Sequence, residues 1–173
     1  MYENVEGKVE IPQRIEYDEL LNFLPHKGKM FLLSRVTAHD VVARKVTTEY
    51  DITKDCIFYE KELDGIPTWS GFELMAQGIS AFSTITRIYN HDPDLSRPGV
   101  VLSVVDFRAN VDVLKNNTTV QMRIDEDYHA DNVYRYNCAI YKNRDDAEPA
   151  ATAKISVMEM KNMEEVLSNA RSK

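Results

Sequence analysis

Glu73 is a lone carboxylate in a segment that is otherwise almost free of charge. Between Pro67 and Tyr89 the only other charged side chain is Arg87. Apolar residues cover most of the circumference of a helix over 67–90, and a helix of this kind is typical of a protein interior. A carboxylate there is costly to ionise unless it has a partner. This is the physical profile of a general acid or base.

A second interpretation of Glu73 needs no chemistry. The residue shares one helical stripe, at spacings of three and four, with the polar residues Gln77, Ser80, Thr84 and Arg87. Such a stripe is also typical of an ordinary polar face, in which Glu73 only complements the helix dipole. The residues alone leave both interpretations open.

Length and charge exclude several classes of protein. The chain has 173 residues, which is long enough for one domain with a proper core. Its formal net charge is −7. No basic cluster stands out, so we expect no nucleic-acid partner. No apolar run approaches the length of a membrane span. The acidic N-terminus lacks the apolar segment that is typical of a signal peptide. We therefore expect a cytoplasmic protein without a membrane partner.

Metal and cofactor chemistry has little support in the sequence. Cys56 and Cys138 are far apart and outside any metal-ligand pattern. The four histidines are scattered, without a second histidine or a cysteine at ligand spacing. No nucleophile elbow, phosphate-binding loop or dinucleotide fingerprint is present. We expect no metal and no cofactor.

The pattern of elements predicts an α+β fold. A short helix is expected at 17–24 and the long buried helix at 67–90. Strand-like runs fall at 30–36, 41–50, 100–108, 120–126, 133–141 and 151–158. Turn residues between the later runs favour antiparallel connections, and no βαβ repetition occurs. We expect a curved antiparallel sheet of about six strands wrapped around one long central helix, dimerising through a sheet edge.

The domain boundaries follow from the same pattern. Residues 1–16 carry mixed charge and are predicted to form a flexible arm, and residues 161–173 a polar tail. The folded domain is expected over 17–160.

Two motifs resemble those of the hotdog superfamily, and of its (3R)-hydroxyacyl-acyl-carrier-protein dehydratases in particular. Leu24-Pro-His-Lys-Gly-Lys-Met-Phe-Leu-Leu-Ser-Arg-Val36 is similar to the Leu-Pro-His segment that opens that family. Glu73-Leu-Met-Ala-Gln77, shortly after Pro67, resembles the family's helix motif, whose glutamate is catalytic. The whole pattern Pro67 to Gln77 is most similar to the dehydratase-like proteins of aryl polyene pigment clusters. The resemblance covers about residues 17–160.

The resemblance implies a lyase of fatty acid or polyketide biosynthesis that acts on 3-hydroxyacyl thioesters held by acyl carrier protein. In that family each active site lies at a dimer interface. Glu73 would be the general acid. We expect the substrate to be bound by backbone N–H groups near the helix start, by an acyl tunnel and by the helix motif. The predicted binding residues are Gly65, Ile66, Pro67, Thr68, Trp69 and Gln77, with Trp69 either closing the tunnel or packing in the core.

One departure from the family pattern affects the second catalytic group. The dehydratases carry a catalytic histidine in a loop shortly before the helix, and here Asp55 to Gly65 contains none. Tyr59 stands at that position by an ungapped count, although a phenol with a reference pKa near 10 is a poor base. His26 is interpreted as structural, bonding backbone. We expect a homodimer or a heterodimer with another hotdog protein, and a histidine-bearing paralogue would complete the site.

Two other functions fit the same residues. A hotdog acyl-thioester hydrolase would use Glu73 or Asp64 to activate water. A non-catalytic acyl-binding or scaffolding subunit would keep Glu73 as a buried structural acid. The missing histidine favours the scaffold over the dehydratase.

Overall fold

The structure is a computed structural model that describes residues 10–92 and 99–160. The predicted tail 161–173 and most of the predicted arm lie outside the described residues. Ile15 and Glu16, which the sequence assigns to the arm, form a short strand instead, and Ile15 is fully buried. Two residues are too few to show a periodic pattern, so this strand has no signal of its own in the sequence.

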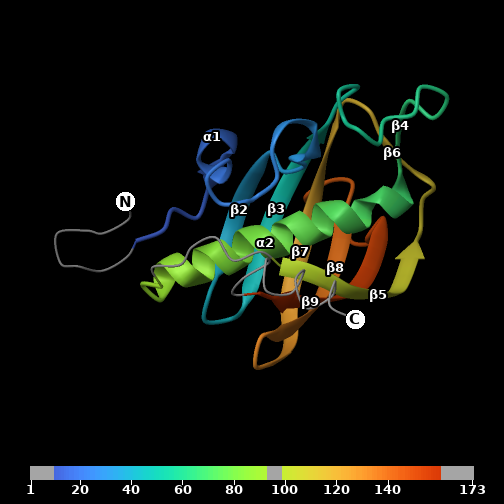
Figure 1. Ribbon diagram of the computed structural model, residues 1–173. Helices are drawn as coiled ribbons and strands as arrows, with labels where there is room; N and C mark the ends of the chain where they lie inside the picture. The colour runs from blue at the N-terminus through green and yellow to red at the C-terminus, as the bar shows by residue number, and fades with distance from the viewer. Residues whose placement is uncertain (1–9, 93–98, 161–173) are drawn as a thin grey trace, which may run out of the picture.

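The described strands form a seven-stranded antiparallel sheet with the order β1-β2-β3-β7-β8-β9-β5 (Figure 1). Its strands are β1 Ile15–Glu16, β2 Arg35–Asp40, β3 Lys45–Ile52, β7 Thr118–Ala130, β8 Val133–Tyr141, β9 Ala151–Glu159 and β5 Gly99–Ala109. A separate two-stranded sheet pairs β4, Gly65–Pro67, with β6, Val113–Lys115. The predicted antiparallel α+β arrangement is confirmed.

The long helix α2, Gly71–Tyr89, crosses the face of the large sheet (Figure 1). It is preceded by a short 3-10 helix, η2, Thr68–Ser70. The sequence places Pro67 at the first helical position, and this is wrong. Pro67 has ψ 136° and ends β4, opposite Val113, because the preceding segment finds a strand partner far along the chain.

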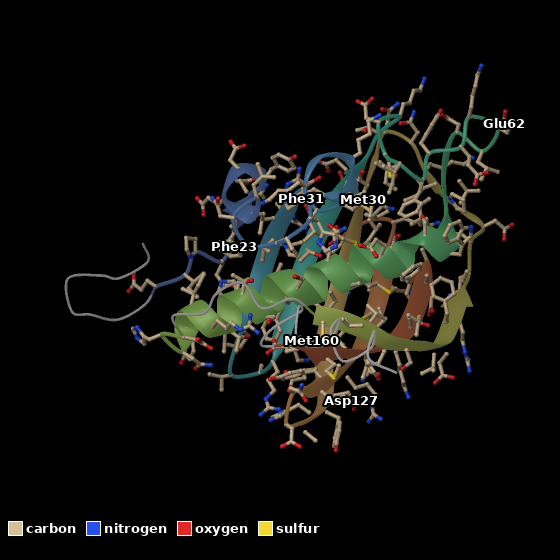
Figure 2. The ribbon with its side chains drawn as sticks, in the orientation of Figure 1. Phe23, Met30, Phe31, Glu62, Asp127 and Met160 are labelled. Atoms are coloured by element: carbon tan, nitrogen blue, oxygen red, sulfur yellow. The ribbon has the colours of Figure 1, made fainter. Side chains whose placement is uncertain are left out.

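The N-terminal part of the domain also differs from the sequence pattern. The short helix α1 covers only Tyr17–Leu20, and a 3-10 helix, η1, lies at Gly28–Met30. The strand predicted to begin at 30 starts at Arg35, as β2. Figure 2 shows Phe23, Met30 and Phe31 on the segment between α1 and β2, above α2 in this view. Residues 21–34 therefore form a strap over the helix rather than part of the sheet.

Helix α2 approaches the sheet closely at two glycines. A Cβ added to Gly78 would lie 2.4 Å from Cδ1 of Ile124 and 3.1 Å from Oγ1 of Thr48. A Cβ at Gly71 would lie 2.5 Å from Cδ1 of Ile140. Because these two positions carry no side chain, the helix can lie close to the sheet. This short distance also determines how deeply the residues on the other faces of the helix are buried.

We therefore expect Gly78→Val to destabilise the protein. The branched side chain overpacks the contact with β3 and β7, and overpacking typically costs about 1–3 kcal/mol. Chemical denaturation followed by circular dichroism measures this change. A variant as stable as the wild type would show that the helix and sheet can separate without loss.

Candidate active site

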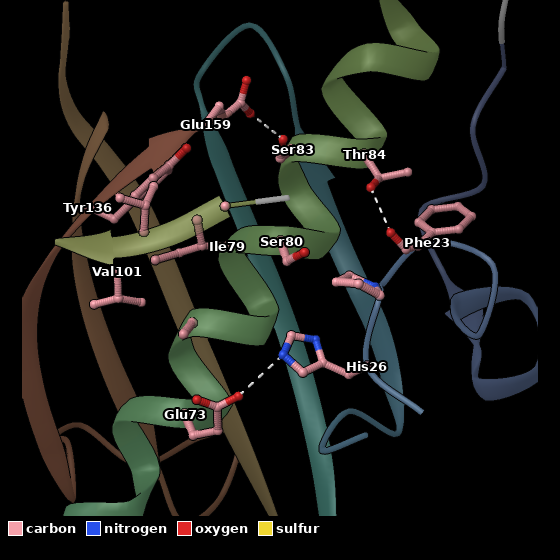
Figure 3. Close-up of a pocket in the computed structure, with 14 residues that line it drawn as sticks. Phe23, His26, Glu73, Ile79, Ser80, Ser83, Thr84, Val101, Tyr136 and Glu159 are labelled. Carbon is pink, nitrogen blue, oxygen red and sulfur yellow. Dashed lines mark hydrogen bonds and ion pairs between the residues drawn. The ribbon is translucent and has the colours of Figure 1, made fainter. Parts of the chain in front are cut away.

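Glu73 lies in the first turn of α2 and faces a cavity of about 120 Å³ (Figure 3). Its side chain is 19% exposed. The cavity runs along one face of the helix and is closed by the strap and by β5, β8 and β9. It is lined by Phe23, Pro25, His26, Glu73, Ala76, Ile79, Ser80, Ser83, Thr84, Gly99, Val101, Tyr136, Val157 and Glu159.

The strap brings His26 to Glu73. The imidazole Nε2 lies 3.6 Å from Oε1 of Glu73, and the His26 side chain is 30% exposed (Figure 3). The backbone hydrogen bond that the sequence interpretation gave His26 is not seen. Its Nδ1 is buried and has no hydrogen-bond partner among the described residues. Sequence reasoning missed this pair, although the Leu-Pro-His segment that carries His26 was the available signal.

Gln77, one turn after Glu73, joins the helix to the strap. Its side-chain amide donates to Oε1 of Glu73 at 2.9 Å and to the carbonyl of Met30 at 2.8 Å. Its amide oxygen accepts from the backbone N–H of Leu32 at 2.7 Å. Gln77 is fully buried. The predicted substrate-binding role of Gln77 is untested, but its side chain positions Glu73 directly.

Two further members of the polar stripe, Thr84 and Arg87, are also engaged rather than turned to water. The Thr84 hydroxyl donates to the carbonyl of Phe23 at 2.9 Å. Arg87 is buried and pairs with Glu159 at 2.6 Å, while the Ser83 hydroxyl donates to the same carboxylate at 2.5 Å (Figure 3). Gln77, Thr84 and Arg87 are therefore anchors, which argues against the interpretation of the stripe as an ordinary solvated face.

The cavity is polar at both ends and mainly apolar between them, where Ser80 is a further polar side chain. Glu73 and His26 mark one end, and the Ser83–Glu159 contact marks the other. Tyr136, from β8, adds a hydroxyl, and burial is the main cause that raises the pKa of Tyr136. The phenol thus stays neutral and able to donate a hydrogen bond across the physiological pH range.

Tyr59 does not line this cavity. Its hydroxyl donates to Oδ1 of Asp64 at 3.1 Å. Desolvation, together with the hydrogen bond to Asp64, raises the pKa of Tyr59, which makes it a still poorer base. Asp64, the alternative group for thioester hydrolysis, also lies outside the cavity lining and accepts from the side-chain amide of Asn116.

The predicted binding segment 65–69 does not line the cavity of the single chain. The N–H of Gly65 faces the carbonyl of Glu60 at 3.5 Å, and that of Thr68 donates to the carbonyl of Asp112 at 2.9 Å. Trp69 is 56% exposed and packs edge-on against Phe58, with ring centroids 5.8 Å apart. Neither predicted role of Trp69, in the core or at the cavity, is seen in the single chain, and the binding role of the segment stays a prediction.

The described residues contain neither a cluster of metal ligands nor a helix that could cross a membrane. No group of three or more histidine, cysteine, aspartate and glutamate side chains could hold a metal ion. Among the helices the structure describes, none combines the length and apolar character needed to cross a membrane.

An antiparallel sheet wrapped around one long buried helix defines the class of hotdog-fold proteins. The sequence narrows this class. The model of the ApeP-like family, described as ApeP dehydratase, matches residues 19–168, and the chain belongs to this family of hotdog dehydratases. No curated protein sequence matches the chain.

Solved structures support the hotdog fold. The dehydratase heterocomplex ApeI:P from Xenorhabdus doucetiae matches with a TM-score of 0.74 and 18% identity, over 87% of this chain and 96% of that chain. The PaaI protein of E. coli, from a phenylacetic acid degradation operon, matches with a TM-score of 0.52 and 8% identity, over 72% of this chain and 78% of that chain. A mutant of the thioesterase PA1618 from Pseudomonas aeruginosa matches with a TM-score of 0.51 and 11% identity, over 73% of this chain and 80% of that chain. At these identities the likeness establishes the fold alone.

The contacts of Gln77 generate a prediction about how the site is held together. Gln77→Leu leaves the N–H of Leu32 and the carbonyl of Met30 without their buried partner, and each unsatisfied buried group costs about 1–3 kcal/mol. We expect a lower melting temperature and faster hydrogen exchange at Leu32. Ser80→Ala, on the same helix face, removes a hydroxyl without such contacts and serves as the control. Equal protection of Leu32 in Gln77→Leu and wild type would contradict the anchoring role.

Proposed function

We propose that this protein is a subunit of a dehydratase that removes water from 3-hydroxyacyl thioesters carried by acyl carrier protein, with Glu73 as the general acid. The observation that carries the proposal is the position of Glu73, in the first turn of a buried helix and at the end of a cavity. The family membership supports the reaction type. The carrier, and a place in aryl polyene or related biosynthesis, rest on the motif resemblance.

The shape of the cavity supports a linear acyl substrate. Glu73 and Thr84 lie three helical turns apart, so the lining extends about 16 Å along α2 at 1.5 Å per residue. The walls between the two polar ends are mainly apolar, with Ile79, Val101 and Val157. A narrow space of this length accepts a chain in extended form and excludes a bulky group.

The reaction needs a proton at the leaving hydroxyl. Elimination removes a proton from the carbon next to the thioester carbonyl and breaks the bond between C3 and the hydroxyl oxygen. Hydroxide is a poor leaving group, so protonation by a carboxylic acid as the bond breaks lowers the barrier. The hydrogen bond from the Gln77 amide to Oε1 of Glu73 holds this carboxyl group in the cavity wall and supports the role.

Replacing Glu73 tests the proposal. Glu73→Gln keeps the shape and still accepts the hydrogen bond from Gln77, so we expect the melting temperature to change little. Turnover in the active form, alone or in complex, should fall by about 10²–10⁴-fold, the usual contribution of a general acid. The assay follows hydration of a 2-enoyl thioester by loss of its ultraviolet absorbance, and release of free thiol reports hydrolysis.

Glu126→Gln is the matched control, because Glu126 is another largely buried carboxylate in contact with a histidine, His129, outside the cavity. We expect it to keep full turnover. Unchanged hydration in Glu73→Gln would refute the role of Glu73. Thiol release that depends on Glu73, without hydration, would favour the thioester hydrolase instead.

We also propose that the active form contains a second hotdog protein bound along β5. This strand is an edge of the described sheet, paired only with β9 (Figure 1). It exposes Val100, Val101, Leu102 and Val105. An edge strand with a row of exposed apolar side chains is a template for pairing with another chain. The exposed Trp69 is a further apolar group that a partner could cover.

Substitution of Leu102 by lysine should disrupt this association. Leu102 is exposed, so the variant should fold normally, while a charge at the strand edge opposes pairing. Val42→Lys is the control, since Val42 is 81% exposed in the turn between β2 and β3. Co-expression with hotdog paralogues, pull-down and light scattering measure the outcome. Unchanged association in Leu102→Lys would contradict the β5 interface, and a pure homodimer would contradict a heteromeric partner.

A further inference from the structure

His26 is held in the cavity by the strap and not by hydrogen bonds of its own. It follows Pro25, and the strap is fixed to the helix on both sides of it, by Thr84 at Phe23 and by Gln77 at Met30. These anchors determine where the imidazole lies. The His26 side chain forms part of the cavity lining, next to Glu73 (Figure 3).

The contacts of His26 do not explain it as a structural residue. A histidine kept for structure usually bonds backbone or a carboxylate through both ring nitrogens. Here Nδ1 is buried without a hydrogen-bond partner among the described residues, and Nε2 faces only the Glu73 carboxylate, at 3.6 Å. A buried polar atom left without a partner is costly, and such atoms are tolerated mostly where they serve function.

Glu73 is held at one of its two carboxylate oxygens. The Gln77 amide and the His26 ring both approach Oε1. Within the described residues no hydrogen bond is made to Oε2, so both neighbours engage the same oxygen. The two groups most able to move protons in the cavity thus lie side by side at the end of the apolar channel.

We propose that His26 is the second catalytic residue, the base that removes the proton next to the thioester carbonyl. This inference rests on the proposed dehydratase function. Neutral His26 takes the proton from C2, the double bond forms between C2 and C3, and the hydroxyl leaves C3 as water with the proton of Glu73. The imidazolium then returns a proton to the Glu73 carboxylate across the 3.6 Å gap. One proton is removed and one delivered, so both groups are restored.

The proposal changes the role of the partner subunit. The loop that carries the family histidine has none here, and Tyr59 in that loop is turned to Asp64. With His26 beside Glu73, the acid and the base come from the same chain. A hotdog partner would then bind and shape the site without supplying its histidine.

Two variants test His26 in the same hydration assay. His26→Gln should reduce kcat by about 10²–10⁴-fold while thioester binding changes little, and its melting temperature should stay near that of the wild type. His26→Ala opens space beside Glu73, and imidazole added to the buffer should restore part of its turnover. His129→Gln is the matched control, because His129 contacts Glu126 at 3.1 Å outside the cavity. It should be fully active and insensitive to imidazole.

The outcomes separate this proposal from the proposed function. Wild-type turnover in His26→Gln, with Glu73→Gln inactive, would overturn the role of His26 and leave the dehydratase intact. Loss of activity with a matching loss of thioester binding, or without rescue by imidazole in His26→Ala, would show a structural role and also overturn it. Full activity in both Glu73→Gln and His26→Gln would remove the dehydratase mechanism itself.

Discussion

The structure depends on how the polar side chains along one stripe of a buried helix find hydrogen-bond partners. Side chains such as Gln77 and Thr84 are buried in α2, and each would cost free energy if it lost water without gaining a partner. The strap 21–34 supplies those partners through its backbone. The amide of Gln77 is central, because it accepts from Leu32, donates to Met30 and also reaches Glu73. One side chain thus connects the fold of the strap to the chemistry of the site.

The same helix meets very different surroundings on its two sides. Toward the sheet, glycines such as Gly78 let the backbone come into contact with the side chains of β3 and β7. On the cavity side, small residues such as Ala76 and Ser80 leave space instead of filling it. The cavity therefore exists because the helix carries small side chains on this face. Glu159 lies at its far end, and the ion pair with Arg87 balances the charge of this carboxylate.

The hotdog fold by itself does not decide between dehydration and thioester hydrolysis, since both kinds of enzyme share it among the similar structures. The distinction lies in the groups that reach the substrate. Glu73 faces the cavity, whereas Asp64 is bound to Tyr59 and Asn116 outside it. The cavity therefore presents the carboxylate of Glu73, and not that of Asp64, to whatever it binds.

The sequence alone determined the elements with long, regular patterns. The apolar circumference of 67–90 predicted the buried helix, and the alternation in 120–126, 133–141 and 151–158 predicted three central strands. The isolated charge of Glu73 and its motif indicated the family. These features are local, because each is carried by neighbours within a few turns of helix or a few residues of strand.

Only the tertiary structure decided what lies next to Glu73. His26 belongs to a segment without helical or strand periodicity, and its position follows from bonds that Gln77 and Thr84 make across the chain. Pro67 is similar, since its strand exists only because β6 pairs with it. Contacts between distant segments depend on packing and on the satisfaction of buried polar groups. A pattern of residue types along the chain does not record which partner satisfies which group.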